Sequence, residues 1–179
     1  MILDFQAGTD FSAAKSRELV LGLLEHTPAP LSRSQFAPGH ITCTGMVLHP
    51  FRHAFLLIHH QKLDRWLLPG GHVEDVDDEP WLAAKREVEE ETSAILTGEP
   101  GRLVGIDVHG IPPRKQEPFH QHHDLIFAFR AASEELVPTE EIHAAIWYDL
   151  ADISLDAYQI PQNTKLCARR AVTQAYSLG

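Results

Sequence analysis

Residues 69–95, PGGHVEDVDDEPWLAAKREVEEETSAI, join a glycine turn, an acidic loop and a segment rich in glutamate. Pro80 suits the first turn of a helix, because the N–H that proline lacks would have no helical partner there. Asp78 or Glu79 precedes this proline near the cap position. The pattern of apolar residues and these flanking signals predict a helix over residues 80–92.

One side of the predicted helix is apolar, and the edge beside it is acidic. At about 100° per residue, Glu87, Glu90 and Glu91 cluster at the edge of the face that we expect to be buried. Glu89 points to the opposite flank. The apolar arc consists of Trp81, Ala84, Val88 and Ile95.

The three clustered glutamates repel one another, and like charges at this spacing cost a helix a few tenths of a kcal/mol. Hard oxygen ligands are those that Mg²⁺ or Mn²⁺ prefers, so a divalent ion would convert the repulsion into coordination. Glycine permits a close backbone approach, so the turn at residues 70–71 could add a carbonyl ligand. The spacing alone leaves open the alternative that this acidic run is a solvated helix face.

Length and charge limit the other possibilities. The chain has 179 residues, which favours one compact domain. Its formal net charge of −10 argues against general nucleic-acid binding, which requires a basic surface. The same charge would repel an anionic substrate, unless a bound divalent cation reverses the local potential.

The cysteines and the hydropathy pattern indicate a reducing, cytoplasmic setting. Cys43 and Cys167 lie far apart and show no metal-ligand spacing, so we expect buried thiols. The first residues lack a signal-peptide pattern, and no apolar run approaches the roughly 18 residues of a spanning helix. We therefore expect no membrane partner.

The remaining elements follow from periodicity and turn residues. An amphipathic helix is predicted over residues 10–26, with Phe11, Ala14, Leu19, Leu23 and Leu24 on its apolar face, and a last helix over residues 163–176. A polar loop is predicted over residues 111–123. This order indicates an α/β fold of the α+β kind, with a mixed sheet covered by helices. Strands are expected at residues 40–48, 54–59, 66–68, 101–110, 124–131 and 144–148.

Residues 107–127, DVHGIPPRKQEPFHQHHDLIF, mix cations, imidazoles and carboxylates, which suits phosphate binding and proton transfer. In an extended strand, His120 and His122 would share one face and His123 would point away. A polar loop with exposed histidines is the alternative. A zinc site built from these histidines is a further alternative.

The helical segment resembles the sequence box of the Nudix hydrolase family, G-x5-E-x7-R-E-U-x-E-E-x-G-U, where U is a bulky aliphatic residue. Gly71 matches the opening glycine, and residues 86–91, REVEEE, match R-E-U-x-E-E without a gap. Counting back from the arginine, Asp78 stands at the internal glutamate position. Ser93 replaces the glycine that usually closes the helix, and Ala94 replaces the bulky aliphatic residue.

The resemblance implies the Nudix fold, a mixed β-sheet sandwiched between helices. It also implies hydrolysis of a nucleoside diphosphate linked to another group, with Mg²⁺ or Mn²⁺ as the cofactor. By the same resemblance, Glu87, Glu90 and Glu91 are metal ligands, and the Gly71 carbonyl is an additional one. Arg86 would orient a glutamate through a charge-assisted hydrogen bond.

The histidine-rich stretch resembles a Nudix subgroup with an H-x-I-P-x-R pattern and an H-x-H-x-D-like pattern after the box. Here the two patterns are His109-Gly-Ile-Pro-Pro-Arg114 and His120-Gln-His-His-Asp124. The resemblance adds four active-site candidates, which are Glu117, His120, His122 and Asp124.

These observations lead to one functional hypothesis and one rival. We expect a single domain over residues 1–179, with an N-terminal helical extension of about residues 1–38. It would hydrolyse a pyrophosphate bond in a small phosphorylated metabolite, and a homodimer is left open. The departures at Asp78 and Ser93 motivate the rival, a Nudix-fold module that binds a nucleotide or metabolite without cleaving it.

Overall fold

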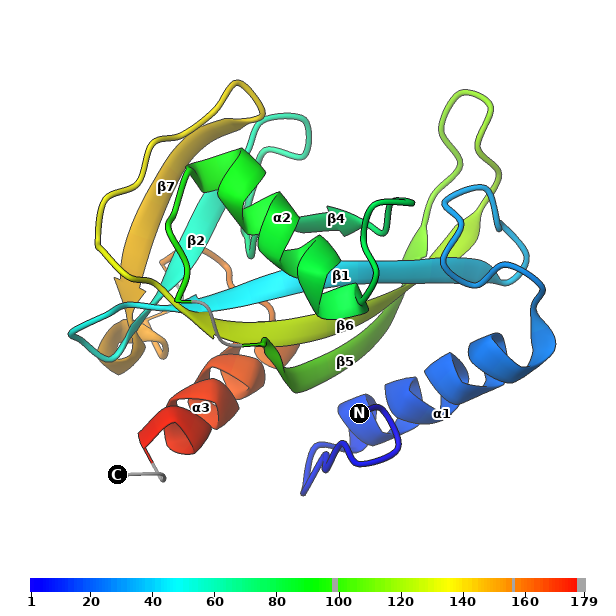
Figure 1. Ribbon diagram of the computed structural model, residues 1–179, viewed down its shortest axis with the longest axis horizontal. Coiled ribbons are helices and arrows are strands. Elements are labelled where there is room, and N and C mark those ends of the chain that lie inside the picture. The colour runs from blue at the N-terminus through cyan, green and yellow to red at the C-terminus, as the bar shows by residue number, and fades with distance from the viewer. Residues whose placement is uncertain (98–99, 156, 177–179) are drawn as a thin grey trace.

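A mixed seven-stranded sheet with helices on both faces forms the protein (Figure 1). The computed structural model describes residues 1–97, 100–155 and 157–176. The strand order is β3-β2-β1-β6-β5, with β4 paired to β1 and β7 paired to β2. The strands are β1 (Gly39–Leu48), β2 (Ala54–His60), β3 (Arg65–Leu67), β4 (Gly70–His72), β5 (Arg102–Ile111), β6 (His120–Arg130) and β7 (Ile142–Asp149). The helices are α1 (Phe11–His26), α2 (Pro80–Thr92) and α3 (Gln162–Tyr176), with a short 3₁₀ turn at Leu150–Asp152.

The core divides into two layers because successive residues of a strand point to opposite faces of the sheet. On β1, Cys43 and Val47 pack in the cluster that contains buried residues of α1 and α2. Met46 and Leu48 pack in the cluster that contains buried residues of α3. The predicted sandwich of a mixed sheet between helices is therefore confirmed.

Strand β6 runs parallel to β1 and antiparallel to β5, which accounts for the mixed character of the sheet. The register places His40 beside His122 and Thr42 beside Asp124. The prediction of a loop up to residue 123 is wrong, because β6 begins at His120. The backbone of this polar segment pairs with two neighbouring strands, and this pairing does not depend on side-chain hydropathy.

Helix α1 begins after Asp10, whose carboxylate accepts a hydrogen bond from the Ala13 amide at 3.0 Å. The predicted apolar face of this helix is wrong in part. Phe11 is 85% exposed, and Leu19 and Leu24 are also exposed. The buried positions repeat every three or four residues, and Phe11, Leu19 and Leu24 lie off this stripe of the helix. The buried residues are Ala13, Ser16, Val20 and Leu23.

Helix α2 has the predicted bounds, from Pro80 to Thr92. Ser93 ends the helix in the left-handed conformation, with φ 53°, and its amide donates to the Glu89 carbonyl. The chain therefore leaves the helix before Ile95, which is exposed and does not extend the apolar arc as predicted.

Two smaller predictions concern the cysteines and the membrane. Cys43 and Cys167 are free and buried, as expected. Within the described parts of the chain, no helix has the length and apolar character needed to cross a membrane.

Candidate functional site

The glycine turn after β3 forms a short strand, β4, which the sequence did not indicate. β4 pairs antiparallel with β1, with Gly71 opposite Cys43 and His72 opposite Thr42. Since neighbouring residues of a strand face opposite sides of the sheet, Gly71 faces the α2 layer and the His72 side chain leaves on the other side.

Gly71 lies directly against the carboxylate of Glu87. A Cβ atom at position 71 would be 2.5 Å from Glu87 Oε1 and 2.7 Å from Glu87 Oε2. Any other residue would displace this carboxylate, so glycine is required here for a close approach and not for an unusual backbone angle. The Gly71 backbone therefore lies beside a carboxylate of α2, while its predicted role as a metal ligand stays a prediction.

Arg86 is the cation at the centre of this site. Its Nη1 atom lies 3.0 Å from Glu87 Oε1 and 3.0 Å from Glu90 Oε2. Its Nη2 atom donates to Asp77 Oδ2 at 2.9 Å and to the His72 carbonyl at 2.9 Å. The planar guanidinium therefore links α2 to both the acidic loop and β4.

Asp77 is a site residue that the sequence analysis missed. Its side chain is only 4% exposed and pairs with Arg86, whereas Asp78 is exposed. Counting forward from Gly71 along G-x5-E leads to Asp77, while counting back from Arg86 leads to Asp78. The loop is one residue longer than the pattern, and only the structure shows which count places the carboxylate correctly.

Glu91 is buried beside β4. It is 5% exposed, and the Gly70 amide donates to its Oε2 atom at 3.1 Å. Burial raises the pKa of Glu91 to about 8. Burial also raises the pKa of Glu87, against the opposing effect of Arg86. Both carboxylates thus lack full charge compensation, and their oxygens are donors of the kind that a hard divalent cation prefers.

The three glutamates have different partners in the structure. Glu87 and Glu90 turn toward Arg86, and the Glu90 side chain is 60% exposed. Glu91 turns toward the amide of Gly70. The helix therefore brings the predicted ligands to one edge of α2, and Arg86 orients two of them.

A group of histidines occupies the sheet face opposite α2. The ring centroids of His40 and His72 are 5.1 Å apart, those of His40 and His122 are 5.0 Å apart, and those of His72 and His122 are 5.3 Å apart. His120 stacks on His40 at 5.1 Å. Burial lowers the pKa of His72 to about 4 and that of His122 to about 3, so both imidazoles are neutral.

Of the predicted candidates from the histidine-rich stretch, three lie on one face of β6 and the fourth, Glu117, lies in the turn before it. His120 and His122 share one face, as expected for a strand, and His123 is buried on the other face. Asp124 lies on the face of His120 and accepts hydrogen bonds from Thr42 and Thr44, at 3.1 Å and 2.8 Å. Glu117 is exposed in the turn between β5 and β6, where its backbone pairs with Arg114.

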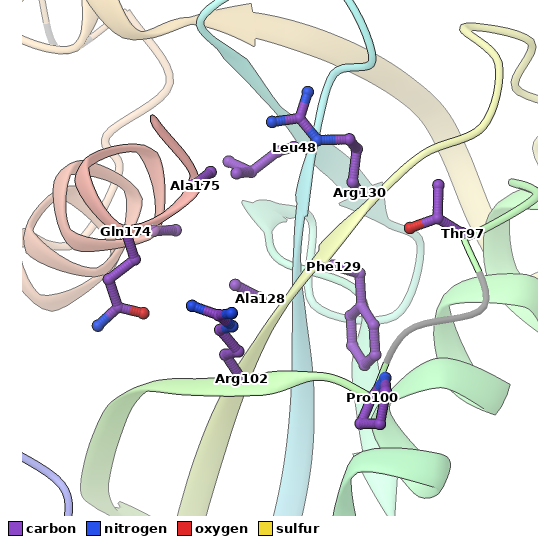
Figure 2. Close-up of a pocket in the computed structure, with 10 residues that line it drawn as sticks. Leu48, Thr97, Pro100, Arg102, Ala128, Phe129, Arg130, Gln174 and Ala175 are labelled. Carbon is purple, nitrogen blue, oxygen red and sulfur yellow. The ribbon is translucent and has the colours of Figure 1, made fainter. Parts of the chain in front are cut away.

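A separate cavity of about 150 Å³ lies at the other end of β1 and β6, beside α3 (Figure 2). Arg102 and Arg130 line it together with Phe129 and Gln174. No predicted site residue contributes to its lining. The cavity is therefore distinct from both the glutamate edge of α2 and the histidines.

Comparisons with known proteins identify the family of the domain. Residues 39–169 match the NUDIX domain model. The chain is 28% identical over 127 residues to an 8-oxo-(d)GTP phosphatase from Mycolicibacterium smegmatis. That match covers 70% of this chain and 36% of the relative, so the chain spans only about a third of that protein.

Solved structures show the same fold. A NUDIX-family hydrolase from Clostridium perfringens is 25% identical, with a TM-score of 0.57 over 76% of this chain and 97% of that one. The NUDIX domain of Shewanella oneidensis NrtR, complexed with ADP ribose, is 15% identical, with a TM-score of 0.55 over 87% of this chain and 97% of that one. Because the family model matches most of its length, the chain belongs to the NUDIX domain family.

Proposed function

We propose that this chain is a divalent-metal-dependent pyrophosphohydrolase. Its substrate would be a nucleoside diphosphate linked to another group, or a related phosphorylated metabolite. The observation that carries the proposal is the half-buried carboxylate of Glu87 and the buried carboxylate of Glu91, which lie beside the backbone of Gly71 and Gly70. Membership in a hydrolase family that generally uses divalent metals supports it.

Four groups would hold Mg²⁺ or Mn²⁺. These are the carboxylates of Glu87, Glu90 and Glu91 and the carbonyl of Gly71, all of them hard oxygen donors. A bound divalent cation would neutralise diphosphate oxygens and lower the pKa of a water molecule. This local positive charge would offset the repulsion of an anionic substrate by a chain with a net charge of −10.

Arg86 acts on the reaction through the glutamates. Its contacts with Glu87 and Glu90 fix where these carboxylates point, and its contact with Asp77 fixes the guanidinium. Arg86 is therefore a positioning residue in this proposal, since geometry held by a rigid network is what preorganises a site.

Glu117, His120 and His122 have a different proposed role. They lie on the histidine face or in the exposed turn, away from α2. We assign Glu117 and His120 to contacts with the substrate, and none of the three to proton transfer at the glutamates. The cytoplasm is the proposed setting, and the two free thiols agree with a reducing compartment.

A hydrolysis screen tests the proposal. The purified chain is incubated with Mg²⁺ or Mn²⁺ and with 8-oxo-dGTP, ADP-ribose and a dinucleoside polyphosphate, and the products are separated by chromatography. We expect metal-dependent cleavage of at least one compound. The first compound is chosen because of the activity named for the mycobacterial relative.

Two variants complete the screen. Glu91→Gln should abolish cleavage, whereas Glu89→Gln should preserve it, because Glu89 pairs with Lys85 on the other flank of α2. Binding without cleavage for every compound that binds would contradict the proposal and favour the nucleotide-binding module.

A further inference from the structure

We propose that His40, His72 and His122 form a second metal site, which takes an imidazole-preferring ion such as Zn²⁺. Each residue offers one ring nitrogen, and the three nitrogens lie within 4.8 Å of one another. Zn–N distances of about 2.0–2.1 Å place tetrahedral nitrogen ligands roughly 3.4 Å apart. Small side-chain rotations therefore close the site around an ion.

His40 gives the second, independent observation. The residue is 1% exposed, and its Nδ1 atom is hydrogen-bonded to the Gln35 carbonyl at 3.1 Å. Its Nε2 atom is buried and has no hydrogen-bond partner among the described residues. Leaving a buried polar atom unpaired is unfavourable, and a bound ion would give this nitrogen a partner. A backbone carbonyl on the other ring nitrogen is how metal-binding histidines are commonly oriented.

Three hydrogen-bonded strands fix the positions of these histidines. His40 on β1 is in register with His122 on β6, and His72 on β4 pairs with Thr42, two residues along β1. Sites built on strands hold their geometry better than sites built on loops. The trio is thus a consequence of the sheet and does not depend on a flexible segment.

The neighbouring histidines have other partners. His120 Nδ1 is hydrogen-bonded to the Pro118 carbonyl at 2.9 Å, and His109 is paired with Asp107 at 2.9 Å. The trio therefore supplies three nitrogen ligands and leaves a fourth position for water or substrate, as in zinc sites with an open position.

The two metal sites would differ in the ion that they select. Imidazole ligands favour Zn²⁺, Cu²⁺ and Ni²⁺, whereas carboxylate and carbonyl oxygens favour Mg²⁺ and Mn²⁺. His72 connects the two sites, because its carbonyl accepts a hydrogen bond from Arg86 while its side chain joins the trio.

Cobalt absorption and zinc calorimetry test the site on protein without an affinity tag. We expect about one equivalent of Zn²⁺ per chain and the visible absorption of four-coordinate Co²⁺. His72→Ala and His122→Ala should each weaken binding by at least about 100-fold. His26→Ala, which removes an exposed histidine of α1, and Glu91→Gln should leave the binding unchanged.

Folding is followed separately, so that loss of binding is not confused with loss of structure. Zn²⁺ should raise the unfolding temperature of the unsubstituted chain and not that of a folded His72→Ala variant. Unchanged Co²⁺ spectra in both histidine variants, or loss of Zn²⁺ binding in Glu91→Gln alone, would overturn the proposal. None of these readouts depends on hydrolysis. The proposed zinc site can therefore be refuted while the proposed hydrolase activity is confirmed, and the activity can be refuted while the zinc site is confirmed.

Discussion

The two faces of β4 carry different chemistry within two consecutive residues. Gly71 lies against the carboxylate of Glu87, on the side of α2. His72 joins His40 and His122 on the other side. Strand alternation alone produces this separation. One short strand can therefore serve an oxygen-rich site and a nitrogen-rich site at once.

Burial acts on the two faces in opposite directions. It raises the pKa of Glu91 to about 8 and lowers that of His122 to about 3, because it disfavours the charged form in both cases. On the glutamate side, a bound cation would compensate the charge of the buried carboxylate. On the histidine side, the neutral imidazole is already the form that binds a metal. The comparison predicts that the two faces respond independently to substitution.

The largest expected effect concerns the ligands on the α2 side. Glu87→Gln should lower turnover by roughly 1000-fold, since it removes a charged group from the reacting site. The Zn²⁺ affinity of the histidine trio should be unchanged. Steady-state kinetics and calorimetry on the same preparation measure the two quantities. Equal losses of turnover and Zn²⁺ affinity would show that the faces are coupled.

Asp77 and Asp78 form a matched pair for stability. Asp77→Ala should lower the free energy of unfolding by about 2 kcal/mol, because it removes the most buried of the carboxylates that pair with Arg86. Asp78→Ala, at an exposed position, should change it by less than about 0.5 kcal/mol. Urea denaturation of both variants compares them. A larger loss of unfolding free energy in Asp78→Ala than in Asp77→Ala would show that Asp78, and not Asp77, has the structural role.

Gly71→Ala should affect activity more than stability. The added Cβ would meet the end of the Glu87 side chain, which can rotate away at small cost. We expect a roughly tenfold loss of turnover, since the displaced carboxylate no longer has its productive position. Gly22→Ala, where a Cβ meets nothing within 4 Å, is the control. Full activity in the first variant would show that the Glu87 position is not critical.

The smallest effect is expected at the end of α2. Ser93 adopts φ 53°, a conformation that glycine accepts without steric cost. Ser93→Gly should therefore raise the free energy of unfolding by about 1 kcal/mol or less. Turnover and metal binding should stay the same. A destabilised variant would mean that the serine side chain makes a compensating contact.

The features with local causes could be predicted from the sequence. Helix α2 has the predicted bounds because Pro80 and the flanking turn residues act within a few positions. The cluster of Glu87, Glu90 and Glu91 follows from helical geometry alone, and the structure places these residues along one edge of α2. Their function as metal ligands stays a prediction.

The features that depend on distant pairing could not be predicted. His40, His72 and His122 come from three strands, and only the sheet register brings them together. The buried face of α1 is a different stripe of the helix from the predicted one, and only the packing against the sheet decides which stripe is covered. Asp77 and not Asp78 pairs with Arg86 because of the path of the loop, which is one residue longer than the family pattern.

Manganese binding tests the glutamate site most directly. Electron paramagnetic resonance of free Mn²⁺ gives the bound fraction while turnover is measured on the same samples. Glu91→Gln should lose both Mn²⁺ binding and turnover, and His72→Ala should retain Mn²⁺ binding. A Glu91→Gln variant with undiminished Mn²⁺ binding and turnover would contradict the assignment of the α2 glutamates.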